Sequence, residues 1–173
     1  QFMGEIPYFG SSVSSAGDVN ADGYDDVVIG SYGDQNTKGR AYVFLGNPSG
    51  MQNRIVMEGE ENGDGFGYSV CKAGDVNFDG FDDVIISAGN EKVFIYLGGQ
   101  QMDNVPDVTL EGEEGGSAFG RSVSYAGDVN GDGFSDVVVG APRYLNNTGR
   151  AYVYFGGRQM DNVPDVVMTG AAV

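Results

Sequence analysis

The chain contains no histidine and no tryptophan, and Cys71 is its single cysteine. One cysteine excludes an intrachain disulfide, so we expect a free thiol with a structural role. Without histidine the chain lacks the side chain used most often for acid–base catalysis, which argues against an enzyme. No apolar run approaches the roughly 18 residues of a membrane span, and the amino-terminal residues lack the basic and apolar regions of a signal peptide. The sequence therefore predicts no membrane insertion.

Basic residues are scarce: nine oppose 25 acidic residues, which gives a formal net charge of −16. Such a surface repels nucleic acid and anionic lipid, so we expect neither as a partner. Proline is also sparse, with five residues, whereas glycine is abundant, with thirty. Together with many Val, Ile, Tyr and Phe residues, this composition favours short strands joined by tight turns.

The organising feature is a pattern that occurs three times. Phe-Gly opens the copies at Phe9, Phe66 and Phe119, so the period is 57 and then 53 residues. Ala-Gly-Asp-Val-Asn and an acidic loop follow in each copy. Four short strands in each unit of about 50 residues are typical of a propeller blade, so we predict an all-β fold of three four-stranded antiparallel blades. Residues 1–173 then form a single propeller segment, with blades at about 8–59, 65–112 and 118–170.

After the first strand of each copy, three further strands are expected. The second strand is β-branched and apolar on both faces, which predicts a position in the buried middle of the blade. The third alternates and ends at glycine, and the fourth is a short apolar segment. In order, these lie at 27–29, 84–86 and 137–139; at 40–45, 92–97 and 150–155; and at 55–57, 108–110 and 166–168.

Each acidic loop reads Asp-x-Asn-x-Asp-Gly-x-x-Asp. Ca²⁺ prefers six to eight oxygen ligands, and alternating side-chain oxygens at positions 1, 3 and 5 can surround one ion. Glycine at position 6 permits a sharp turn, which lets the backbone carbonyl of position 7 face the metal, and Asp at position 9 completes the shell. We therefore predict three Ca²⁺ sites, whose ligands are Asp18, Asn20, Asp22, Tyr24 and Asp26; Asp75, Asn77, Asp79, Phe81 and Asp83; and Asp128, Asn130, Asp132, Phe134 and Asp136.

The second half of the loop excludes an EF-hand. An EF-hand requires a bidentate Glu at position 12, where this chain has Ile29, Ile86 or Val139 within a β-branched run. The shell is complete without an open position, which favours a structural rather than a catalytic metal. The position-8 residues differ in charge between copies and are expected to point outward: Asp25, Asp82 and Ser135.

The Phe-Gly heads, the Asp-x-Asn-x-Asp-Gly loops and Gly140-Ala141-Pro142 in copy three resemble FG-GAP repeats, the blades of the integrin α-subunit propeller. Copies one and two depart from Gly-Ala-Pro, with Gly30-Ser31-Tyr32 and Ser87-Ala88-Gly89. The resemblance implies that the metal loops lie on one face and are largely structural. Partners then bind at the opposite face, through the loops between second and third strands (B–C) and between blades (D–A). Candidate contact residues there are Tyr32, Asp34, Arg143, Tyr144 and Asn146.

The leading hypothesis is an extracellular or cell-surface module for adhesion or protein binding, whose blades Ca²⁺ makes rigid. Three blades cannot close a ring of the usual four to eight, so further blades are expected from the same longer chain or from self-association. Two alternatives stay open: a structural building block of a ring or filament, and a carbohydrate-binding propeller. Asn146-Asn147-Thr148 is also a glycosylation sequon.

Overall fold

The computed structural model describes residues 7–33, 35–51, 53–113 and 115–171. Its strands form three four-stranded antiparallel sheets, as the repeat predicts. Sheet one contains β1 (Ser12–Gly17), β2 (Asp26–Ser31), β3 (Arg40–Leu45) and β4 (Asn53–Glu58). Sheet two contains β5 (Val70–Gly74), β6 (Asp83–Ser87), β7 (Lys92–Tyr96) and β8 (Val108–Glu111). Sheet three contains β9 (Ser122–Gly127), β10 (Asp136–Ala141), β11 (Arg150–Tyr154) and β12 (Val166–Thr169).

Strand order within each sheet follows chain order, so the second strand lies between the first and the third. This confirms the position expected for the β-branched runs. In sheet two, every residue of β6 is buried. A strand that has neighbours on both edges and packed layers on both faces needs apolar residues on both faces, and Val84-Ile85-Ile86 provides them.

A β-bulge precedes each acidic loop. The pairing register shifts at Ala16 in sheet one, at Ala73 in sheet two and at Ala126 in sheet three. The glycine after each alanine has a positive φ, which is 76° at Gly17 and 73° at Gly74. A bulge of this kind twists the strand end and redirects the chain, so the loop leaves each sheet in the same direction.

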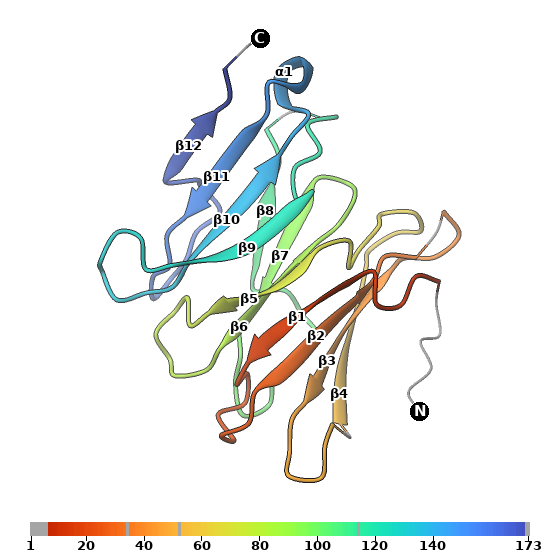
Figure 1. Cartoon of the computed structure of the whole chain (residues 1–173), viewed down its shortest axis with the longest axis vertical. Helices are drawn as coiled ribbons and strands as arrows, with labels where there is room; N and C mark the ends of the chain where they lie inside the picture. The colour runs from red at the N-terminus through yellow and green to blue at the C-terminus, as the bar shows by residue number, and fades with distance from the viewer. Residues whose placement is uncertain (1–6, 34, 52, 114, 172–173) are drawn as a thin grey trace.

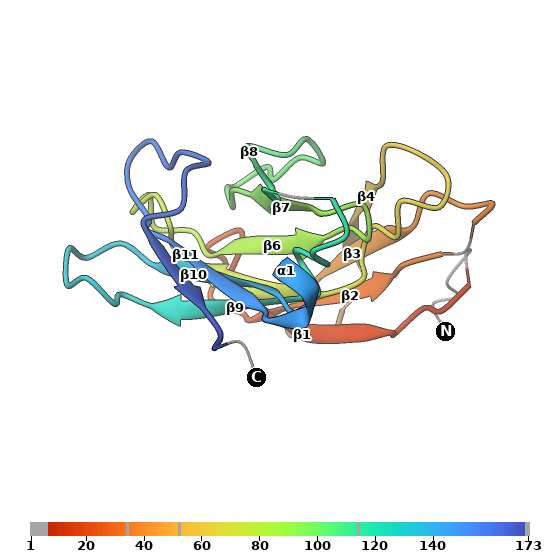
Figure 2. The same cartoon turned by 90° about the horizontal axis from the view of Figure 1, so that it is seen from above.

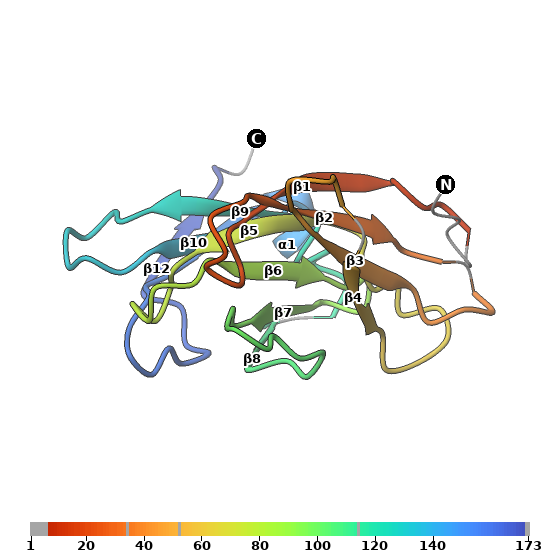
Figure 3. The same ribbon diagram turned by 90° about the horizontal axis from the view of Figure 1, so that it is seen from below.

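The sheets are arranged side by side like a fan, with their first strands in contact (Figures 1 and 2). Figure 3 shows β1, β5 and β9 along one edge of the molecule and β4 and β8 toward the opposite edge. Two hydrophobic cores fill the spaces between neighbouring sheets: one between sheets one and two, and one between sheets two and three. The half-buried Cys71 packs against the second core. This arrangement is that of consecutive propeller blades.

The Phe-Gly phenylalanines anchor these cores. Phe66 is buried and lies 5.6 Å from the ring of Phe94, and Phe119 lies edge-on to Tyr152 at 5.3 Å. Aromatic pairs at such distances add a favourable ring interaction to the burial of apolar surface. The Phe-Gly signature therefore marks the residue that joins one sheet to its predecessor.

The acidic loops and the B–C loops lie at opposite ends of the strands (Figure 1). Among the described residues there is one helical element, α1 (Tyr144–Asn147), which lies in the third B–C loop. Its residues Leu145 and Asn146 have positive φ angles of 42° and 55°. Within the described ranges, no helix is long and apolar enough to cross a membrane.

Candidate metal centre

The acidic loops turn at positions 4 and 6, where the backbone enters the left-handed region. In loop one, φ is 54° at Ala21 and 89° at Gly23. Loop two repeats this at Phe78 and Gly80. Glycine at position 6 thus has the role that the sequence predicts, because a positive φ near 90° favours a residue without Cβ. The positive φ at position 4 is harder to predict from the sequence, because only the third copy has glycine there and the first two have Ala21 and Phe78.

Position 1 of each loop organises the turn. The Asp18 carboxylate accepts hydrogen bonds from the backbone N–H groups of Asp22 (3.0 Å) and Gly23 (2.8 Å). Asp75 accepts the equivalent bonds in loop two. These contacts hold the carboxylate at the centre of the turn. This is the position expected for the first ligand of a loop that surrounds an ion.

Positions 3 and 5 face each other in all three loops. The amide of Asn20 donates to the Asp22 carboxylate at 3.0 Å, and the other carboxylate oxygen of Asp22 accepts from the Tyr24 N–H at 3.0 Å. The equivalent amide–carboxylate pairs are Asn77–Asp79 at 2.8 Å and Asn130–Asp132 at 2.7 Å. Together with position 1, which bonds to the position-5 N–H, three of the expected metal ligands in each loop are therefore neighbours.

The position-9 aspartate has a second role that sequence reasoning missed. Asp26 is buried, and its two oxygens accept from the backbone N–H groups of Val19 (2.9 Å) and Gly46 (2.7 Å). This side chain fastens the acidic loop to the turn after β3. The equivalent aspartates, Asp83 and Asp136, bind the corresponding N–H groups in sheets two and three.

In loops one and two, the charges of the loop act on its buried aspartate. Burial raises the pKa of Asp83 to about 7; its two backbone hydrogen bonds oppose this, and the charges of Asp79 and Asp75 add to it. The pKa of Asp26 is raised mainly by burial, with further contributions from Asp22 and Asp18. A carboxylate held out of water near other carboxylates favours a cation beside it, because a cation offsets both costs.

Loops one and two also contact the sheet that follows each of them. The backbone N–H of Asp18 donates to the Asp82 carboxylate at 3.0 Å, and the N–H of Asp82 donates back to the Asp18 carbonyl at 3.1 Å. The expectation that position 8 points outward is therefore wrong for Asp82, which joins sheets one and two. Among the described residues no sheet precedes Asp25, and this side chain is exposed. Repeat spacing alone could not reveal this contact, because it depends on how blades are placed beside one another.

The donor chemistry of the loops fits Ca²⁺. Each loop supplies carboxylate, amide and carbonyl oxygens, with no nitrogen or sulfur ligand, as a hard cation requires. Among the described residues, however, no group of three or more acidic, cysteine or histidine side chains is arranged to hold a metal. The carboxylate oxygens instead accept hydrogen bonds from backbone N–H groups, and one of the expected side-chain ligands in each loop is an asparagine.

The expected contact residues at the opposite end have different environments. Arg143 and Asn146 are exposed, and Tyr32 stacks on Tyr8 with ring centroids 4.6 Å apart. Tyr144 is instead buried in the core between sheets two and three, so its expected role as a contact residue is wrong. Asp34 lies outside the described residues.

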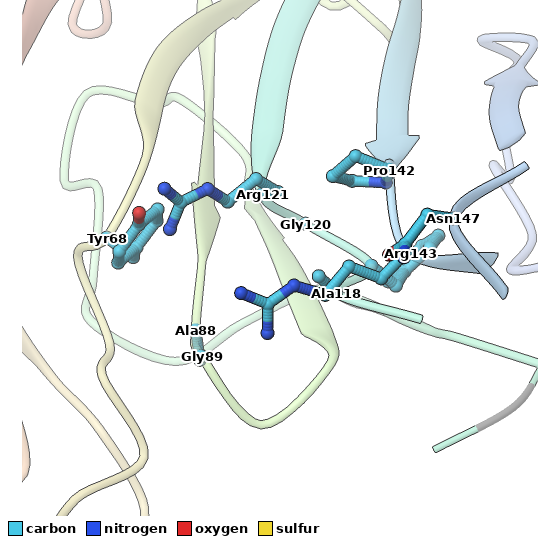
Figure 4. A pocket seen from close by; sticks show the side chains of 10 residues that line it. Tyr68, Ala88, Gly89, Ala118, Gly120, Arg121, Pro142, Arg143 and Asn147 are labelled. Carbon is cyan, nitrogen blue, oxygen red and sulfur yellow. The ribbon is translucent and has the colours of Figure 1, made fainter. Parts of the chain in front are cut away.

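One cavity at this end was not predicted. It has a volume of about 500 Å³ and lies between sheets two and three, where Tyr68, Arg121, Arg143 and Asn147 contribute to its lining (Figure 4). The signal available in the sequence is the residue after each Phe-Gly, which changes from Ser11 to Tyr68 to Arg121.

Comparison with known proteins agrees with the fold. The model of the FG-GAP repeat matches residues 9–44, 66–101 and 119–154. The chain belongs to the FG-GAP repeat family. Among curated FG-GAP relatives, it is 36% identical to integrin alpha-PS5 of Drosophila melanogaster over 78% of its length, and 34% identical to integrin alpha-5 of Xenopus laevis over 94%. It is also 31% identical to integrin alpha-8 of Mus musculus over 94%.

The chain spans only about one sixth of these relatives: 15% of integrin alpha-PS5, 17% of integrin alpha-5 and 16% of integrin alpha-8. The similarity therefore concerns a set of FG-GAP blades.

Proposed function

We propose that this chain is an extracellular or cell-surface FG-GAP module for adhesion or protein binding, in which one Ca²⁺ in each acidic loop makes the joints between blades rigid. The observation that carries the proposal is the repeated loop geometry: all three loops place the same oxygen donors in the same turn. Integrin relatives that match over most of the chain support a binding role rather than a catalytic one.

The position of the loops explains how the ion acts. Loop one bonds to sheet two through Asp82, and loop two bonds to sheet three through the Ser135 N–H and the Asp75 carbonyl at 3.1 Å. A cation that fixes a loop therefore also fixes the sheet that follows. Extracellular modules bind Ca²⁺ with dissociation constants of about 0.1–1 mM, which supports an extracellular location for sites made of exposed loops.

Calcium titration of the metal-stripped protein tests the proposal. Calorimetry should give three sites, and saturation at about ten times the dissociation constant should stabilise the fold by about 1.4 kcal/mol per site. For a chain of this size, three such sites raise the melting temperature by about 10 °C. No uptake of Ca²⁺ and an unchanged melting temperature would overturn it.

A matched pair of variants in loop one separates coordination from charge. Asp22→Asn and Asp25→Asn each remove one negative charge, but only Asp22 belongs to the expected ligands. The first should reduce the stoichiometry from three sites to two, and the second should leave three. Equal effects of the two variants would show that the ions respond to the acidic surface and not to a coordinating loop.

The outer faces of sheets one and three favour a second role, as a building block that continues into further blades. Exposed apolar side chains on these faces include Val13 in sheet one and Val129 and Met168 at the end of sheet three. Contiguous exposed apolar patches mark association sites. We propose that further FG-GAP blades of the same longer chain cover them, with a ring or filament of copies as the alternative. Sedimentation of the chain at rising concentration tests this: a monomer supports the first arrangement, and a defined dimer or a polymer supports the second.

A further inference from the structure

Two arginines from neighbouring segments line the cavity between sheets two and three. Arg121 precedes β9, and Arg143 lies in the connection between β10 and β11. In Figure 4 both side chains extend toward the side of the cavity where Tyr68, Ala88 and Gly89 lie. The Arg121 guanidinium lies over the Tyr68 ring at 4.7 Å from its centroid, which fixes its direction.

Charge pairing distinguishes these two arginines from three other basic residues of the chain. Arg40, Lys92 and Arg150 form ion pairs with glutamates at 3.1, 2.9 and 2.6 Å. Within the described part of the chain, no carboxylate forms an ion pair with Arg121 or Arg143. In a chain of net charge −16 with only nine basic residues, two arginines that share a cavity without an acidic partner form a local site for an anion. The planar guanidinium group matches the geometry of a carboxylate and can bind it through two hydrogen bonds.

The loop beside the cavity is held in an uncommon conformation. Leu145, Asn146 and Asn147 have φ angles of 42°, 55° and 66° in succession. Such angles are unfavourable for leucine, and they persist only where the surrounding structure enforces them. The backbone N–H of Arg143 donates to the Ser117 carbonyl at 2.9 Å, which fixes the start of this loop against the connection between sheets two and three. Arg143 therefore projects from a constrained backbone.

A row of tyrosines extends from the cavity to the segments that precede β1 and follow β2 at the same end of sheet one. The ring centroids of Tyr68 and Tyr32 are 5.7 Å apart, and Tyr32 stacks on Tyr8 with ring centroids 4.6 Å apart. Tyrosine and arginine are enriched at the positions that contribute most to protein–protein binding. A ligand that contacts both the cavity and this row must be longer than a single small anion, which favours a polypeptide.

We propose that this cavity binds a carboxylate, presented by an acidic side chain of a protein partner, between the guanidinium groups of Arg121 and Arg143. The inference rests on the proposed function as a protein-binding module and specifies the chemistry of the partner. The tyrosine row supports the flanking residues of the bound segment.

Side-chain NMR of the intact, calcium-loaded chain tests the proposal. The arginine Nε–Hε resonances are followed during titration with an acetylated and amidated Gly-Gly-Glu-Gly-Gly peptide. We expect the signals of Arg121 and Arg143 to shift, and the matched Gly-Gly-Gln-Gly-Gly peptide to leave them unchanged. Arg121→Gln or Arg143→Gln should weaken binding about tenfold or more, since each removes charge-assisted hydrogen bonds. Arg158→Gln, an exposed change outside the cavity, should leave the affinity unchanged.

Competing ligands identify the source of the anion. Equal shifts with the glutamine peptide, or no loss of affinity in either arginine variant, would overturn the proposal. Tighter binding of inorganic phosphate or of glucuronate than of the glutamate peptide would also overturn it, in favour of a phosphate or an acidic sugar. The outcome is separable from that of the proposed function. Three Ca²⁺ sites without peptide binding reject only the cavity, and peptide binding without Ca²⁺ uptake rejects only the metal sites.

Discussion

Equivalent residues of the three repeats have very different environments at the ends and in the middle of the chain. The valine four residues after the Phe-Gly phenylalanine is 64% exposed in sheet one (Val13) but 5% and 6% exposed in sheets two and three (Val70 and Val123). The same residue type at the same strand position is buried only where a preceding sheet covers it. Burial in this molecule is thus a property of the interface between blades and not of the blade.

The opposite face gives the reverse comparison. The valine after the first loop aspartate is fully buried in loops one and two (Val19 and Val76) but 56% exposed in loop three (Val129), where no sheet follows. Sheet one therefore exposes the surface that would contact a preceding sheet, and sheet three exposes the surface that would contact a following sheet. In repeat proteins, stability is approximately a sum of repeat and interface terms, so matched substitutions can measure the interface directly.

The largest difference is expected for the Phe-Gly phenylalanines. Phe66→Ala removes a buried ring from the core between sheets one and two and should cost about 3–5 kcal/mol of unfolding free energy. Phe9→Ala removes a ring that is 38% exposed and should cost less than half as much. Urea denaturation at micromolar protein concentration measures both. Equal costs would contradict the comparison and show that the outer face of sheet one is covered in solution.

Glycine substitutions before the acidic loops should give the next largest difference. Gly17 and Gly127 have similar φ angles of 76° and 81°, so alanine is similarly strained at both. A Cβ at Gly17 would also collide with the Asp82 carboxylate of the next sheet, whereas at Gly127 it meets nothing. Gly17→Ala should therefore destabilise the fold by about 1–3 kcal/mol more than Gly127→Ala. Thermal and urea unfolding of the two variants test this, and identical losses would show that the collision is relieved without cost.

These interfaces mark the limit of what the sequence could predict. Repeat spacing, β-branched runs and the position-6 glycines were sufficient for the strands, their order and the loop turns, because these depend on residues within one copy. The Asp82 contact, the buried Tyr144 and the cavity beside Arg121 all depend on a neighbouring sheet or on the path of a long loop. The repeat period contains no information on such contacts. Asp25, the position-8 residue of the first copy, is exposed and makes no equivalent contact, so comparing the copies does not indicate the role of Asp82 in the second.

Asp82 and Asp25 occupy the same position in loops two and one and allow a smaller, more specific test. Asp82→Ala removes the acceptor of the Asp18 N–H across the joint and should cost about 1–2 kcal/mol. Asp25→Ala removes the same charge at an exposed position and should change stability by less than about 0.5 kcal/mol. Denaturant unfolding at fixed Ca²⁺ concentration separates the two. If both variants are equally stable, the hydrogen bond between the sheets contributes nothing measurable.

The smallest effect concerns Ca²⁺ affinity in covered and open loops. The Val19 and Val76 carbonyls accept hydrogen bonds from Gly99 and Gly157 of the following sheets, both at 2.8 Å, which holds loops one and two in place. No sheet follows loop three in the part of the chain that the structure describes, so more of its backbone must be ordered when the ion binds. This entropy cost lowers affinity.

We therefore expect loop three to bind Ca²⁺ severalfold more weakly than loops one and two. In calorimetry, Asp132→Asn should remove the weakest site and leave two tight ones, whereas Asp79→Asn should remove a tight site and leave one tight and one weak. The reverse assignment would show that contact with the next blade does not preorganise these loops. A difference that disappears as the protein associates at high concentration would instead show that a following blade supplies the missing contacts, because only coverage of loop three can make the three sites equivalent.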